Sequence, residues 1–412
     1  MRALFGSVSE KRDVLLLSLV AFLPISRAFL FVRNQLNRDA GNYAVVDFQN
    51  SINIVAAALM LWFLLRPRAR LSNELMLRGP TQWMIVYLGL CLLSLIWAGN
   101  PLYIAYQSLE LVIVLFFMGH ILCLIADPHD AILYLCRFSA ATAFLPYFGG
   151  VLRSGGDIFQ HTNSFSTCGA FGAILILSCM KTGVLTLTEV KYSLIGCLVP
   201  FVFGTSAASN IAFIVGLILL WSLSAEPPRT VRRMVFATAV ACCVAVVAFE
   251  MLMPYLFPGK PLEQILSLHG RISLWREFLT IGRQQMVLGG GFVVGERSVD
   301  LWGGGFGSAH NALISVFINT GIVGLILFAG AWLAILRRTY LCHLCGDPYA
   351  YPLLAAMIVG LVNGMSYSLV GSSWRYVTTP FFGIVAYASI FLNPAYYACK
   401  DEYLLADDLC SS

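Results

Sequence analysis

The sequence is poor in charged residues. Asp, Glu, Lys and Arg make up 11% of the 412 residues, whereas a typical soluble domain carries about 25%. Hydrophobic residues reach 59% and the mean hydropathy is +0.79. A soluble protein cannot keep so much apolar surface away from water. The composition therefore excludes a cytosolic enzyme, a secreted domain and a disordered chain, and it predicts a polytopic membrane protein.

Two widespread functional motifs are also absent. The chain has no GxxxxGK(S/T) segment, which argues against an ATP-driven motor, and no HExxH zinc motif. Cys342-His343-Leu344-Cys345 has ligand-like spacing, but a structural zinc site needs four ligands and no second pair lies nearby. We therefore expect no metal and no cofactor. The net charge of +5 is attributed to cytoplasmic loops and not to nucleic-acid binding.

Apolar runs of membrane-spanning length recur along the chain. A spanning helix uses about 20 residues, so the apolar content allows about twelve spans. The runs are 14–32, 44–65, 82–98, 102–125, 130–149, 164–184, 192–206, 207–224, 234–253, 312–336, 350–369 and 377–393. The expected fold is all-α, a single integral membrane domain over residues 1–412 with about twelve transmembrane helices.

Lys and Arg in the short loops predict the orientation, because they favour the cytoplasmic side. One side carries most of these cations: Arg2, Lys11, Arg12, Arg66, Arg68, Arg70, Arg78, Lys181, Lys191, Arg229, Arg232, Arg233, Arg337, Arg338 and Lys400. The short loops opposite hold only Arg33, Arg38, Arg153 and Arg375. We predict a multi-pass protein of the bacterial inner membrane with both termini in the cytoplasm.

One long loop, residues 254–309, falls on the outer side under this map. It contains helix-like stretches at 262–268 and 273–284 and glycine clusters at 289–291 and 303–305. Loops of this length are uncommon and are usually functional or disordered. Because this loop has helical patterning, we expect it to be folded and to form part of an active site.

Three polar clusters share the outer face under the same map. The first runs from Arg153 through His161 to Asn163, the second is Gly270-Arg271 followed by Trp275 and Arg276, and the third is His310-Asn311 before the tenth run. Arginine makes planar bidentate contacts to phosphate oxygens, a helix start binds anions, and histidine accepts a proton near neutral pH. Together they favour glycosyl transfer from a pyrophosphate ester.

Each residue also has a simpler interpretation. An arginine just outside a span is often an interfacial anchor, and Asn311 or Asn163 could cap the following helix. His161 could be an interfacial polar residue. Gly321 and Gly324 more readily explain close packing than chemistry. The hypothesis of an active site depends on the coincidence of the three clusters at one face.

The clusters resemble a known family. Gly270-Arg271, Trp275, Gly289 to Gly291, His310-Asn311 and the pair Gly321/Gly324 are similar to the shared domain of bacterial O-antigen ligases and polysaccharide polymerases. Upstream, Arg153, Phe159, His161 and Asn163 resemble the family's Arg…Gly-x-Phe-x-His-x-Asn segment, and Trp97-Ala-Gly-Asn100-Pro101 resembles its Trp-x-x-(Asp/Asn)-Pro segment. The resemblance covers most of residues 95–340.

This resemblance implies a metal-independent, inverting glycosyltransferase of the multi-span, GT-C-like type. Its donor would be an undecaprenyl-pyrophosphate-linked oligosaccharide at the periplasmic face. By analogy His310 is the catalytic base, Arg153 and Arg271 contact the pyrophosphate, and the remaining candidates bind substrate: His161, Asn163, Asn311, Trp275 and Arg276. One feature departs from the family. Many members have Ser-Arg between the seventh and eighth spans, where this chain reads Thr205-Ser206-Ala207-Ala208, so Arg276 or Arg375 would have to replace that arginine.

Two roles within the family remain open. A polymerase extends exopolysaccharide or O-antigen chains from lipid-linked repeat units, whereas a ligase transfers the glycan to lipid A-core. The His161 segment and the Gly-Arg…Trp spacing favour the polymerase. A lipid or polysaccharide transporter is a more remote alternative, because transporters often contain repeats and none is visible. The bilayer and the lipid-linked glycan are the expected partners, with chain-length regulators and export proteins as further candidates.

Overall fold

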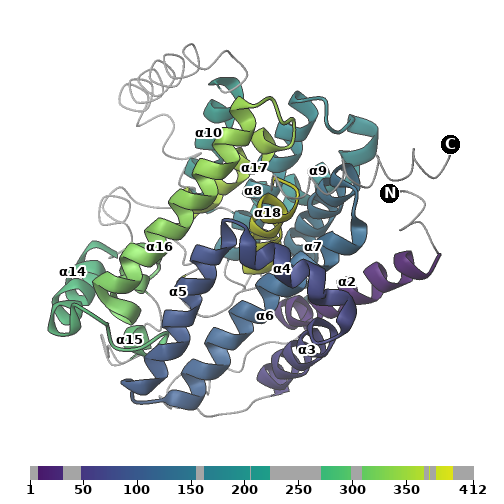
Figure 1. Cartoon of the computed structure of the whole chain (residues 1–412). Helices are drawn as coiled ribbons and strands as arrows, with labels where there is room; N and C mark the ends of the chain where they lie inside the picture. The colour runs from purple at the N-terminus through teal and green to yellow at the C-terminus, as the bar shows by residue number, and fades with distance from the viewer. Residues whose placement is uncertain are drawn as a thin grey trace, which may run out of the picture.

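The protein is a bundle of helices in the computed structural model (Figure 1). The structure describes residues 8–30, 48–154, 162–204, 206–222, 271–297, 309–365, 371 and 377–392, and this part of the chain contains helices and no strands. Its elements are α2 Val8–Leu30, α3 Phe48–Leu64, η2 Pro67–Ala69, α4 Arg70–Arg78, α5 Thr81–Leu93, η3 Ser94–Ile96, α6 Pro101–Ile125, α7 Pro128–Ser154, α8 Thr162–Lys181, α9 Leu187–Phe203, α10 Ala207–Ser222, α14 Arg271–Gly282, η4 Arg283–Gln285, α15 Val294–Arg297, α16 Ala312–Leu344, α17 Ala350–Gly364 and α18 Thr378–Ile390.

The all-α prediction is confirmed for these residues, but the count of twelve spans is not. Every predicted run except the ninth, which lies outside the described residues, contains a helix. Four of these helices are long and apolar enough to cross a membrane, and a bent pair brings the number to five. The four are Pro101–Ile125, Pro128–Leu152, Ser164–Lys181 and Ala312–Leu344. Four further apolar helices are shorter than their sequence runs suggested: Thr81–Ile96, Ala207–Ser222, Ala350–Gly364 and Thr378–Ile390.

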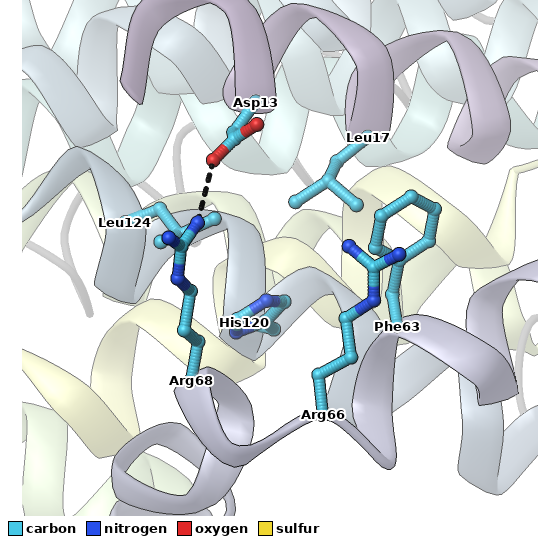
Figure 2. A pocket seen from close by; sticks show the side chains of 7 residues that line it. All are labelled: Asp13, Leu17, Phe63, Arg66, Arg68, His120 and Leu124. Atoms are coloured by element: carbon cyan, nitrogen blue, oxygen red, sulfur yellow. Dashed lines mark hydrogen bonds and ion pairs between the residues drawn. The ribbon is translucent and has the colours of Figure 1, made fainter. Parts of the chain in front are cut away.

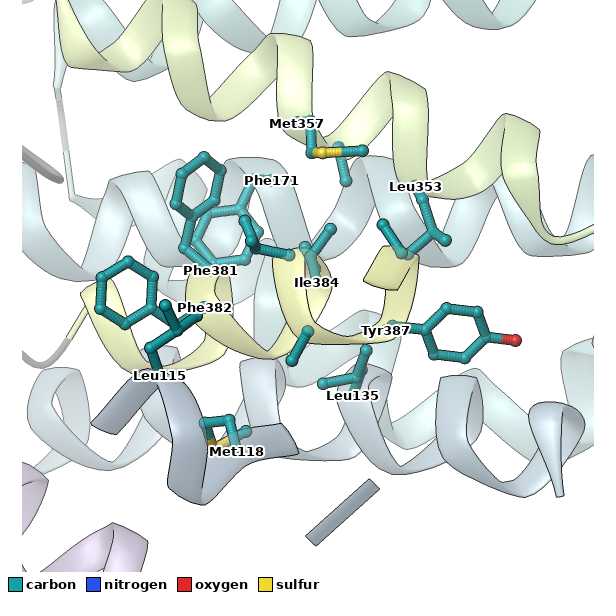
Figure 3. Close-up of a cluster of buried hydrophobic side chains, with 14 of the residues drawn as sticks. Leu115, Met118, Leu135, Phe171, Leu353, Met357, Phe381, Phe382, Ile384 and Tyr387 are labelled. Carbon is teal, nitrogen blue, oxygen red and sulfur yellow. The ribbon is translucent and has the colours of Figure 1, made fainter. Parts of the chain in front are cut away.

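The short helix α18 explains part of this difference. All its residues from Thr378 to Ile390 are buried, and a helix that is apolar all round belongs inside a protein. Figure 3 shows its side chains surrounded by residues of α6, α7, α8 and α17. At 13 residues it spans about 20 Å, less than the hydrocarbon thickness of about 30 Å. The last apolar run is thus a core helix enclosed by its neighbours.

The helices α6 and α7 define two ends of the bundle. α6 has 25 residues, which corresponds to about 37 Å. The turn at Ala126–Asp127 reverses the chain, and α7 returns over 27 residues. The start of α6 and the last turn of α7 therefore lie at one end, and Asp127 lies at the other. The candidate site is at the end where α6 begins.

Candidate functional site

The long helix α16 is broken at Gly321. This residue has φ 65° and ψ −164°, a non-helical conformation inside the range Ala312–Leu344. A break leaves carbonyl and N–H groups without helical partners, and inside a membrane such groups must be satisfied by protein. The first part of α16, residues 312–320, consequently needs a neighbouring segment that completes its hydrogen bonds.

The segment 286–291 of the long loop fills the break. It exchanges backbone hydrogen bonds with α16 in both directions: Gly290 N to Ile318 O at 2.8 Å, Gly291 N to Asn319 O at 2.9 Å, Ile322 N to Met286 O at 2.8 Å and Val323 N to Val287 O at 3.3 Å. These bonds tie the loop to the helix at a defined register. The first predicted glycine cluster, residues 289–291, is thus bound to α16 by backbone hydrogen bonds.

Glycine is required at both sides of this contact. A Cβ on Gly321 would lie 2.2 Å from the carbonyl oxygen of Val287, and a Cβ on Gly289 would lie 2.5 Å from the backbone of Asn319. The φ and ψ of Gly321 also fall in a region that is nearly restricted to glycine. The prediction that Gly321 permits close packing is correct, although its neighbour is a loop and not a second helix.

The predicted catalytic residue His310 lies in the turn that begins α16. Its φ is 52°, a left-handed conformation in which histidine is over-represented among non-glycine residues. The side chain is half-buried. Trp275 of α14 fixes the preceding residue, because its Nε1–H donates to the carbonyl oxygen of Ala309 at 2.9 Å. The second and third sequence clusters are therefore in direct contact.

Asn311 is the N-cap of α16. Its Oδ1 accepts from Leu313 N at 3.0 Å and Ile314 N at 3.1 Å, and its Nδ2 donates to the carbonyl oxygen of Met365 at 2.9 Å. The capping alternative for this residue is therefore observed. It also corrects the expected anion site at this helix start, since these two N–H groups already have a partner.

The buried side chain of Glu296 supports the His310 turn by hydrogen bonding. Glu296 of α15 is 0% exposed. Its Oε1 accepts the backbone N–H of Ala309 at 3.1 Å and the hydroxyl of Ser315, and its own N–H donates to Oδ1 of Asn319 at 3.0 Å. Glu296 therefore links the long loop, the His310 turn and the first part of α16.

The same loop is anchored to the beginning of α6. The Nε1–H of Trp97 donates to the carbonyl oxygen of Gly289 at 3.2 Å, and the hydroxyl of Ser94 accepts from Phe292 N at 2.9 Å. Asn100 caps α6 through Tyr103 N. The Trp-x-x-Asn-Pro segment singled out in the sequence thus holds the glycine-rich segment in place (Figure 1, lower left).

The remaining candidates are placed only by their backbones or not at all. Arg153 lies in the last turn of α7 and Asn163 near the start of α8, at the same end of the bundle as Trp97. Arg271 is the first residue of α14. The side chains of these three residues lie outside the description, as do His161 and Arg375 entirely. Arg276 lies on α14 with an exposed side chain.

The turn that departs from the family pattern contributes buried hydroxyl groups. Ser206 accepts from the hydroxyl of Ser209 at 3.1 Å, which also lies 3.2 Å from Oδ1 of Asn363. Thr167 of α8 joins them, 3.3 Å from the Ser209 hydroxyl. The two helices α9 and α10 that the sequence predicted on either side of this turn are observed. Thr205 lies outside the described residues.

One group with metal-ligand spacing is found among the described residues: Asp127, His129 and Asp130. The carboxylate of Asp127 accepts the backbone N–H groups of His129 at 2.9 Å and Asp130 at 3.1 Å, as an N-cap does. His129 is also 3.4 Å from Glu189. Capping and ion pairing explain this cluster, which lies at the opposite end of α6 from Trp97.

Glu296, Ser315 and Asn319 were not predicted as parts of the site from the sequence. Ser315 and Asn319 are four residues apart in an apolar run, so they share a helix face, and that polar stripe was a usable signal. No sequence signal indicated the role of Glu296, because an acidic residue in a predicted outer loop is normally exposed. Its role follows from the return of the loop to α16.

Residues 192–329 match the family model described as O-antigen ligase. The match includes α14, the glycine-rich segment, Glu296, His310 and the break at Gly321, while the Arg153 and Trp97 segments precede it. No curated protein matches the chain. The segment 192–329 is therefore similar to the O-antigen ligase family, which supports the resemblance inferred from the sequence motifs within this range.

Proposed function

We propose that the protein is an inner-membrane glycosyltransferase that uses an undecaprenyl-pyrophosphate-linked glycan as donor at the periplasmic face and polymerises exopolysaccharide or O-antigen repeat units. The supporting observation is the His310 turn, which hydrogen bonds of Trp275, Asn311 and Glu296 hold in place. A reacting group must be positioned this firmly for efficient transfer. The loop 254–309 would form the extramembrane part of the site.

In the proposed reaction His310 removes the proton from an acceptor hydroxyl. The resulting oxygen attacks the anomeric carbon of the donor sugar, with inversion. The bond between this carbon and the pyrophosphate oxygen breaks, and its electron pair leaves with the lipid pyrophosphate. Arg153 and Arg271 would stabilise that charge in place of a metal ion, with His161, Asn163, Trp275 and Arg276 contacting the substrate. Asn311 would position the turn as the cap of α16 and not bind substrate itself.

Replacement of His310 tests the assignment. His310→Ala should abolish glycan transfer, while the protein still inserts and accumulates in the membrane. The matched control is His129→Ala, because His129 lies partly exposed in the first turn of α7, at the other end of α6. Wild-type transfer by the His310 variant would refute the role of this residue as the base.

A ligase is the second candidate, and the description of the matching family model favours it. Purified protein should be given lipid-linked repeat units alone. Longer lipid-linked chains would support the polymerase. Transfer that begins only after lipid A-core is added would refute it and support the ligase.

A further inference from the structure

A small cavity lies at the end of the bundle opposite the His310 turn. It measures about 30 Å³ and is lined by residues of α2, α3, α6 and the α3–α4 connection: Asp13, Leu17, Phe63, Arg66, Arg68, His120 and Leu124. His120 and Leu124 are in the last turns of α6, whereas the glycine-rich loop contacts the residues before the start of that helix. The cavity is therefore separate from the proposed catalytic site.

Two arginines define the mouth of this cavity. Figure 2 shows the side chains of Arg66 and Arg68 extending from the α3–α4 connection on either side of the His120 ring. Arg66 stacks on Trp62, with Cζ 3.7 Å from the ring centroid, and this cation–π contact orients its guanidinium group. Arg68 is paired with Asp13 at 3.3 Å. The cavity is thus lined by two guanidinium groups and one carboxyl group.

The cavity lining combines one buried imidazole ring with apolar side chains. His120 is 4% exposed, and its Nδ1 is 3.3 Å from the hydroxyl of the buried Ser72. Leu17, Phe63 and Leu124 form the sides. The volume holds about two water-sized groups, so a phosphate group at the mouth would place only part of its oxygen atoms inside.

The surroundings favour a lipid as the source of that phosphate. α3 and the segment Pro67–Arg78 meet at 81°, so if α3 crosses the bilayer, α4 lies close to the membrane plane. Large apolar side chains are exposed on the helices next to the cavity: Leu15, Leu16 and Leu19 on α2, and Trp62 and Leu65 at the end of α3. Such side chains can contact acyl chains while the arginines reach the headgroup.

We propose that Arg66 and Arg68 bind the phosphate of an anionic glycerophospholipid at the cavity mouth, with its acyl chains along α2 and α3. The ion pair with Asp13 holds Arg68 in position and reduces its charge in the absence of lipid. This site would serve binding of a bilayer lipid and not glycan transfer. Its location agrees with the predicted cytoplasmic side, where anionic headgroups attract arginines.

The test measures lipid binding to the purified full-length protein in detergent by native mass spectrometry. The probes are phosphatidylglycerol, phosphatidylcholine with the same acyl chains, and glycerol 1-phosphate, which has none. Phosphatidylglycerol should bind most tightly. Arg66→Gln and Arg68→Gln should each weaken this binding about fivefold. The matched control is Arg70→Gln, because Arg70 is exposed and paired with Glu74, and it should bind like the wild type.

Asp13→Asn separates lipid binding from a purely structural ion pair. Removal of this carboxylate releases Arg68, so phosphatidylglycerol should bind more tightly. Weaker binding by Asp13→Asn, or an equal loss in Arg70→Gln and Arg66→Gln, would overturn the proposal. Equal binding of glycerol 1-phosphate and phosphatidylglycerol would overturn a lipid as the ligand. Unchanged elution and melting temperature would show that each variant is folded.

Discussion

The carboxylate of Glu296 accepts the backbone N–H of Ala309 at 3.1 Å, one residue before His310. The two residues are joined across the part of the long loop that lies outside the described structure. Because Glu296 also accepts the Ser315 hydroxyl, one buried oxygen connects the loop, the turn and the helix. The position of His310 therefore depends on a residue that is fully enclosed.

Replacement of Glu296 should destabilise the His310 turn, because it removes hydrogen bonds as well as side-chain volume. Glu296→Ala leaves the Ala309 N–H and the Ser315 hydroxyl without this acceptor, which costs about 1–3 kcal/mol for an unsatisfied buried group. We expect a lower melting temperature and strongly reduced glycan transfer. Glu296→Gln keeps an acceptor oxygen and should retain more of both. Glu277→Ala, an exposed acidic residue on α14, serves as control, and equal effects of the two alanine variants would contradict the assignment.

The break in α16 should not tolerate a side chain at Gly321. Gly321→Ala places a Cβ 2.2 Å from Val287 O and imposes backbone strain of about 1–3 kcal/mol, so the loop 286–291 should detach and transfer activity should be lost. Gly330→Ala on the same helix is the control, because nothing lies within 4 Å of its added Cβ. This change should be neutral or slightly stabilising. Limited proteolysis and melting temperature measure both effects, and a stable, active Gly321→Ala would argue against the packing.

Glycan transfer should not require a divalent metal. In the proposed mechanism permanently charged arginines neutralise the departing pyrophosphate. Initial rates with lipid-linked substrate should therefore be unchanged after EDTA treatment. Complete loss of activity, restored by Mg²⁺, would show that a metal supplies this charge instead.

The start of α9 should be stabilised in a pH-dependent way. The N–H and the hydroxyl of Thr186 donate to Oε2 of Glu189 at 2.7 and 2.6 Å, respectively, and these bonds hold the pKa of the Glu189 carboxyl below its ordinary value of 4.5. A lowered pKa in the folded state means that the stabilisation is present above 4.5 and is lost as the pH falls through the lowered pKa.

We therefore expect the wild type to melt at a higher temperature than Glu189→Gln near neutral pH, with the difference disappearing in acid. Lys191→Gln, an exposed residue on the same helix, provides the comparison. A difference that stays constant from neutral to acidic pH would exclude the carboxylate as its cause.

The membrane class and the helical fold could be predicted because they follow from composition and local pattern. Apolar runs separated by Arg, Asn and Gly indicate helices whatever their tertiary neighbours are. The helices α6, α7 and α16 therefore fall near their expected ranges. The pairing of Trp275 with the His310 turn was also accessible, because both motifs resemble one family. The number of membrane spans could not be predicted, since an apolar run such as 377–393 is compatible with either a spanning helix or a buried one.

The amino-acid sequence by itself thus determined the apolar, helical character of the described residues and the similarity of residues 192–329 to the O-antigen ligases, and it suggested His310 as the candidate base. Only the tertiary structure decided that α18 is enclosed, that the loop 286–291 completes a broken helix, and that Glu296 supports the His310 turn. The physical reason is distance along the chain. The local sequence pattern reflects contacts between residues that are close together in one helix. A carbonyl at a helix break or a buried acidic side chain, in contrast, forms its hydrogen bonds with a distant segment that approaches only when the chain folds.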